Sequence, residues 1–189
     1  DINVEPAWEF CTGDPSIIVA VMDEGVMYKH EDLAANMWVN QAELNGQKGV
    51  DDDGNGYVDD VYGYNFAKDQ GDITWTDPED SGHGTHVAGT ISAVNNNGIG
   101  VCGIAGGSGN NDGVKIMSVQ AFDGKKSVSV AASARAIQYA ANNGASILQC
   151  SWGGGAYGSD KAYEDDCRAE VVALKYFIET ERPGSPLNG

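Results

Sequence analysis

Three runs of apolar and β-branched residues alternate along the chain with segments of helical pattern, and this alternation limits the possible folds most. The runs cover residues 16–22, 114–122 and 145–151. The segments with small or apolar residues at helical spacing cover 84–96, 128–142 and 165–180. Continuous apolar runs indicate strands that are buried on both faces. We therefore predict an α/β fold with three layers, α/β/α, around a mostly parallel sheet.

The length and the charge of the chain narrow the possible classes of protein. The 189 residues carry a net charge of −17, which argues against nucleic acid and anionic membranes as partners. No apolar run approaches the ~20 residues that a membrane span needs, and the chain does not start with a signal-peptide pattern. We find no repeat or linker and expect residues 1–189 to belong to one domain. The acidic balance favours a secreted protein, or a periplasmic or cell-surface one.

The four cysteines do not follow the spacing of a zinc site. No Cys-x-x-Cys pair occurs among Cys11, Cys102, Cys150 and Cys167. Cys102 and Cys150 lie within apolar runs, which predicts buried free thiols. The sequence does not decide whether Cys11 and Cys167 form a disulfide.

One aspartate and one histidine stand where catalytic chemistry is expected. Asp23 follows the first apolar run, at the strand end where parallel sheets place active residues. His83 lies between two glycines at a predicted helix start, so its imidazole could act as a general base that a carboxylate orients. The helix N-terminus is expected to lower the pKa of His83. A metal pair of His83 with His86 is the alternative, although no third ligand stands at a suitable spacing.

The segments IIVAVMDEGVMYKHEDL, SGHGTHVAGTI and SILQCSWGG occur in this order and resemble the subtilisin family of serine peptidases, peptidase family S8. The resemblance extends from about residue 16 to residue 178. It implies that Asp23 is the triad aspartate, that His83 is the general base and that His86 is structural. It also implies that Ser151, Trp152 and Gly153 form the strand that pairs with a peptide substrate, so that Ser151 is not the nucleophile.

The chain departs from the family pattern in its catalytic groups. It contains no Gly-Thr-Ser-Met-Ala motif, which carries the nucleophile in the family, and no counterpart of the oxyanion-hole asparagine. We therefore expect the N-terminal part of a serine endopeptidase domain, incomplete at its C-terminus and inactive without the C-terminal remainder of that domain. The alternatives are a non-catalytic pseudopeptidase that binds peptides, and a trimmed fragment that is inactive by itself.

An acidic, glycine-rich segment, DDDGNGYVDD, predicts a calcium site at residues 51–60. Its oxygen-bearing residues alternate, and Gly56 takes the place of the sharp turn, as in the first half of an EF-hand loop. Tyr62 stands where a full EF-hand has its glutamate, so only half of the motif is present. The candidate ligands are Asp51, Asp53, Asn55, Tyr57 through its carbonyl, and Asp59. The alternative is an acidic turn that binds no ion.

The family resemblance implies a second calcium site. In the family, the aspartate after the histidine of a His-Pro-Asp-Leu-like motif and the loop after the histidine-bearing helix hold the ion. The matching positions here lie in HEDL and VNNNGIGV. The candidate ligands are Asp32, Val94, Asn97, Ile99 and Val101. In both sites we expect Ca²⁺ to be structural and to stabilise the folded state.

Overall fold

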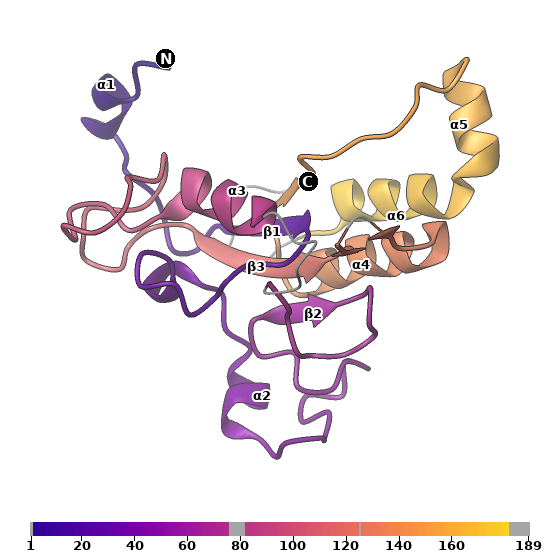
Figure 1. The fold of residues 1–189 in the computed structure, drawn as a ribbon, viewed down its shortest axis with the longest axis horizontal. Helices are drawn as coiled ribbons and strands as arrows, with labels where there is room; N and C mark the ends of the chain where they lie inside the picture. Colours follow the sequence, from indigo (N-terminus) through magenta and orange to yellow (C-terminus); the bar gives the residue numbers. More distant parts are fainter. Residues whose placement is uncertain (1, 76–81, 125, 182–189) are drawn as a thin grey trace.

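A computed structural model describes residues 2–75, 82–124 and 126–181 of the chain (Figure 1). Within these residues, four strands form a parallel sheet in the order β2-β3-β1-β6. The bounds are β1 Ile18–Asp23, β2 Gly63–Asn65, β3 Lys115–Gln120 and β6 Ile147–Gln149. A short antiparallel pair, β4 Phe122–Asp123 with β5 Lys126–Ser127, follows β3.

Helices cover both faces of the sheet, which confirms the predicted α/β/α arrangement. Along β1, Val19 and Val21 belong to one apolar cluster with Ala88 of helix α3 (His83–Ser92). The alternate residues of β1 join a second cluster with α4 (Val130–Asn142) and α6 (Arg168–Glu179). The two clusters follow from the alternation of side chains along a strand, and Figure 1 shows α3 apart from the paired helices α4 and α6.

Side chains at the N-terminal ends cap several of the helices. The side chain of Asn40 accepts a hydrogen bond from the backbone N–H of Ala42 at the start of α2, and Ser129 and Ser159 cap α4 and α5 in the same way. The bounds are α1 Glu5–Trp8, the 3-10 turn η1 Ala34–Asn36, α2 Gln41–Asn45 and α5 Asp160–Asp166.

Several predicted elements differ in their bounds from those observed. The helix predicted over 165–180 is two helices, α5 and α6, which meet at Cys167. The helix predicted over 84–96 ends at Ser92, since a loop closes over Asp32 instead. The run 114–122 divides into β3 and β4. The short elements α1 and β2 were not predicted, because three or four residues carry too little periodicity.

The cysteine predictions are partly wrong. All four thiols are free, so the pair Cys11 and Cys167 forms no disulfide. Cys102 and Cys150 are exposed rather than buried, whereas Cys167 is buried between α5 and α6. None of the helices in the described ranges has the length and apolar character that crossing a membrane requires.

Candidate active site

Asp23 and His83 meet at the carboxyl end of the sheet. Asp23 is the last residue of β1 and is only 2% exposed, whereas His83 is the first residue of α3 and its side chain is 45% exposed. The His83 Nδ1 atom lies 2.9 Å from both carboxylate oxygens of Asp23. The backbone N–H of Glu24 also donates to Asp23 Oδ1, at 2.8 Å. The carboxylate is thus held in place and in turn orients the imidazole.

Two glycines allow α3 to approach the end of β1 this closely. A Cβ atom on Gly84 would lie 2.6 Å from the carbonyl oxygen of Gly25 and 3.2 Å from Cβ of Asp23. Gly25 has a φ of +111°, and a Cβ there would lie 2.4 Å from the carbonyl oxygen of Thr74. Any larger residue at either position would push the helix or the loop away from the aspartate.

The carboxylates raise the pKa of His83, contrary to the expectation from the helix N-terminus. The hydrogen bond to Asp23 is the largest cause, and the charges of Asp23 and Glu24 add to it, while desolvation acts in the opposite direction. The imidazole lies in direct contact with one carboxylate, and a positive charge on it is therefore favoured. The prediction of a lowered pKa was wrong, because the hydrogen bond with Asp23 outweighs the effect of the helix N-terminus.

Ser151, Trp152 and Gly153 follow β6 and are exposed. The indole Nε1 of Trp152 donates to the carbonyl oxygen of Met22, the residue before Asp23, at 2.7 Å. The Ser151 hydroxyl accepts a hydrogen bond from the Gln149 side chain at 2.8 Å. This segment therefore lies at the same end of the sheet as Asp23 and His83.

The residues of the acidic loop separate into two groups. The Asp51 carboxylate accepts hydrogen bonds from the backbone N–H groups of Gly54, Asn55 and Gly56, and these bonds lower its pKa. The Asp59 carboxylate accepts from the backbone N–H of Gly49, at 3.0 Å to each oxygen. These two aspartates thus hold turns of the loop.

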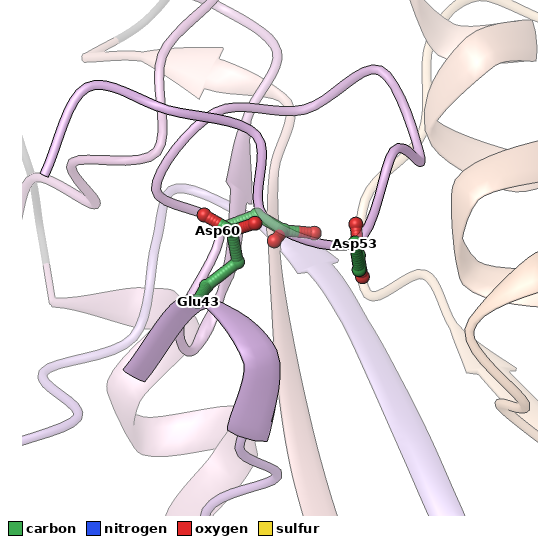
Figure 2. A group of neighbouring side chains, drawn as sticks. All are labelled: Glu43, Asp53 and Asp60. Atoms are coloured by element: carbon green, nitrogen blue, oxygen red, sulfur yellow. The ribbon is translucent and has the colours of Figure 1, made fainter. Parts of the chain in front are cut away.

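A group of three carboxylates lies beside them and combines one predicted residue with two that sequence reasoning missed. Carboxylate oxygens of Glu43, Asp53 and Asp60 all lie within 4.8 Å of one another (Figure 2). The Asn40 side-chain amide donates to Asp53 at 2.9 Å and to Asp60 at 2.8 Å. The Asn55 amide also donates to both, at 3.1 and 3.0 Å. The three carboxylates supply oxygen ligands, the kind that Ca²⁺ prefers.

Burial sets the protonation of Asp60. The residue is fully buried, and desolvation raises the pKa of its carboxyl to about 6, although the hydroxyl of Tyr139 and two amides donate to it. Glu43 is also buried, and it accepts hydrogen bonds from the backbone N–H groups of Asp52 and Asp59. Two buried carboxylates beside a third are costly unless a proton or a cation compensates their charge.

The residues of the second candidate site also lie together. Asp32 is 3% exposed, and its carboxylate accepts from the Asn97 amide at 2.7 Å and from the Val101 backbone N–H at 2.9 Å. The backbone N–H of Ile99 donates to the Asn97 side chain, and that of Val94 donates to the Asp32 carbonyl. Four of the five predicted residues thus belong to one loop, which folds around the fifth, Asp32.

Comparison with known proteins identifies the family. The model of the subtilase family of peptidases matches residues 14–181, which include Asp23, His83 and the segment after β6. The chain belongs to the subtilase family. This membership confirms the resemblance that the sequence motifs indicated.

Several subtilases resemble the chain in sequence and in structure. Subtilisin-like protease 1 of Plasmodium berghei is 40% identical over 134 residues, which are 71% of this chain and 21% of that protein. The halolysin-like extracellular serine protease Nep of Natrialba magadii is 34% identical over 154 residues, 80% of this chain and 23% of that protein. Fervidolysin from Fervidobacterium pennivorans, a keratinolytic enzyme, matches 94% of this chain and 22% of its own at a TM-score of 0.61 and 28% identity. The chain thus spans about a fifth of the length of these relatives.

Proposed function

We propose that this chain supplies the aspartate and the histidine of a subtilase serine endopeptidase. The contact between the Asp23 carboxylate and His83 Nδ1 is the observation that carries the proposal. A proton on Nδ1 is held by the carboxylate, so the lone pair of Nε2 is available to take the proton of a serine hydroxyl. Asp23 then stabilises the imidazolium that forms.

The nucleophile and the oxyanion-hole asparagine come, in this proposal, from residues beyond those of the chain. Ser151 is no substitute, because its hydroxyl accepts from Gln149 and no described contact joins it to His83. The family membership and the short span of the match relative to the relatives support a division of the catalytic groups along a longer protein. The 189 residues alone are then inactive.

The exposed segment Ser151–Gly153 is the proposed binding strand for the peptide substrate. Its backbone N–H and C=O groups lie beside the end of β1, where Trp152 anchors it to Met22. An extended peptide could pair with such a segment as an added strand. The scissile bond would then lie near the carboxyl end of the sheet, within reach of His83.

Calcium is proposed as a structural ion near Glu43, Asp53 and Asp60, and at the Asp32 loop. At the first place, Glu43, Asp53 and Asp60 offer carboxylate oxygens, the ligands that a hard cation prefers. Asp51 and Asp59 hold the turns there and are less suited as ligands than the initial pattern predicted. At the second place, the proposed ligands are Asp32, the Asn97 side chain and the backbone carbonyls of Val94, Ile99 and Val101. We also propose that the protein is secreted, in line with the similar protease Nep of Natrialba magadii, which is an extracellular serine protease.

A fluorophosphonate probe, which reacts with activated serines, tests the proposed function. We expect the longer protein that carries this chain to be labelled, and the His83→Ala variant to lose nearly all labelling. The isolated 19.8 kDa chain should keep its mass. A stoichiometric adduct on the isolated chain would place the nucleophile within it and contradict the proposal. Peptide binding without labelling of the longer protein would support the pseudopeptidase instead.

A further inference from the structure

A cavity of about 350 Å³ lies beside the proposed binding strand, on the face of the sheet that α4 and α6 cover. Trp152 and Phe122 form part of its wall, with ring centres 5.5 Å apart, and Met22 at the end of β1 also lines it. Tyr157 and Tyr163 form another part, with ring centres 5.2 Å apart. A peptide on the binding strand could place one side chain in this cavity.

One residue of the cavity wall carries a buried polar atom that has no partner in the described part of the chain. Ser133 of α4 lines the cavity and is only 3% exposed. Its Oγ atom is buried and has no hydrogen-bond partner within the described part of the chain. A buried hydroxyl without a partner costs about 1–3 kcal/mol. A ligand group that hydrogen-bonds to Ser133 would remove this cost.

The charge of the cavity is negative. Glu170 of α6 is half-buried in the wall, and the hydroxyl of Tyr163 donates to its Oε2 atom at 3.2 Å. Among the described residues that line the cavity, Glu170 is the one charged side chain, and no lysine, arginine or histidine faces it there. The net charge of −17 adds to the attraction for a cation.

The aromatic walls suit the methylene groups of a long cationic side chain. The rings of Trp152 and of the two tyrosines offer apolar surface to a chain of methylene groups. A cation near these rings gains a further cation–π attraction. A small or acidic side chain would leave the Ser133 hydroxyl without a partner and the Glu170 charge without a cation.

From these contacts, we propose that the cavity receives the lysine or arginine side chain of a peptide substrate, with its charged end near Glu170 and Ser133. The inference rests on the proposed function, because the peptide is taken to lie along Ser151–Gly153. It names the class of substrate: peptides with a basic residue at the one position whose side chain enters the cavity.

A peptide library tests the inference on the longer protein that carries the chain. A positional-scanning library of hexapeptides identifies the position, and three matched peptides with lysine, norleucine or glutamate there follow. Norleucine keeps the methylene chain of lysine and removes its charge. We expect kcat/KM for the lysine peptide to exceed that for norleucine by roughly tenfold, as for a charge-assisted hydrogen bond, and glutamate to be the poorest.

Two variants assign the preference to the cavity. Glu170→Gln keeps an acceptor for Tyr163 and removes the charge, so the lysine and norleucine peptides should become equal within about twofold. Ser133→Ala should lower the lysine preference and leave the norleucine peptide unchanged. Labelling by the fluorophosphonate probe should stay at the level of the wild type in both, which shows that the variants fold and keep their catalytic groups.

The outcomes separate the cavity from the proposed function. Binding of the same three peptides is also measured by fluorescence anisotropy with fluorescein-tagged copies. A lysine preference in binding that depends on Glu170, without cleavage, would keep the cavity assignment and reject the endopeptidase. Cleavage without a preference that depends on Glu170 would keep the endopeptidase and overturn the assignment. If the lysine peptide is neither bound nor cleaved, the cavity assignment is overturned as well.

Discussion

The contact between Asp23 and His83 joins a buried carboxylate to a half-exposed imidazole. The Asp23 carboxylate is held in place, because Asp23 is the last residue of a central strand and its side chain accepts a hydrogen bond from the backbone N–H of Glu24. The exposed side leaves room for a serine and a substrate. Since the contact raises the pKa of His83, the neutral base becomes the main form at a higher pH than for an ordinary histidine.

Replacing Asp23 by asparagine should move the titration of His83 to lower pH. The pKa of His83 is higher in the folded protein than its ordinary value of 6.5. The contribution of the Asp23–His83 pair to stability is therefore fully present below pH 6.5 and is lost as the pH rises through the pKa of the folded state. Asp23→Asn removes the largest cause of the raised pKa and, in the longer protein that carries this chain, should also lower kcat by about 10⁴-fold through the wrong tautomer. NMR of the imidazole protons follows the titration, and the chain has only three histidines to assign.

Glu24→Gln is the matched control for Asp23→Asn. Glu24 contributes a smaller increase to the His83 pKa, so its replacement should give a smaller shift and retain most of the activity. An unchanged titration of His83 in Asp23→Asn would contradict the assignment of the carboxylate as the dominant cause.

At the scale of elements, the packing of α3 against the loop after β1 brings Asp23 and His83 together. Gly84→Ala should lower the free energy of unfolding by about 1–3 kcal/mol, because the added Cβ meets the carbonyl oxygen of Gly25 at 2.6 Å. Gly89→Ala in the same helix is the control: no atom lies within 4 Å of its Cβ, so alanine should stabilise the helix by about 0.5–1 kcal/mol. Urea unfolding measures both, and equal midpoints would contradict the close approach.

The central elements could be predicted from sequence because their apolar residues are contiguous. The run around β1 has no polar alternation, whereas the run around β3 contains the polar residues Ser118 and Gln120; both strands are buried on their two faces. The segment 165–180 has one helical pattern, yet its first two residues end α5 and the rest forms α6, because Cys167 between them has a non-helical conformation. A backbone change at a single residue leaves the spacing of apolar residues unaltered, so periodicity does not reveal it.

At the scale of the whole molecule, the acidic region combines parts of the chain that no local pattern connects. Asp53 belongs to the glycine-rich segment that sequence reasoning selected, whereas Glu43 comes from α2 and was missed. The loop pattern predicted Asp59 as a ligand instead of its neighbour Asp60. In the fold, Asp60 points inward and accepts a hydrogen bond from the hydroxyl of Tyr139 on α4. Alternation along a loop predicts which residues are acidic and near one another, but it does not predict which carboxylates turn inward.

Removal of calcium should therefore destabilise the whole domain, because the Asp60–Tyr139 contact connects the acidic region to α4. We expect calcium at a hundred times its Kd to stabilise the fold by about 2.7 kcal/mol, or about 5–10 °C in Tm. Asp53→Asn should lose part of this increase, with the remainder due to the Asp32 loop. Asp165→Asn, which removes an exposed carboxylate paired with Lys161 on α5, should keep all of it. Thermal unfolding with and without a chelator measures the difference, and an equal increase in Asp53→Asn and wild type would exclude Asp53 as a ligand.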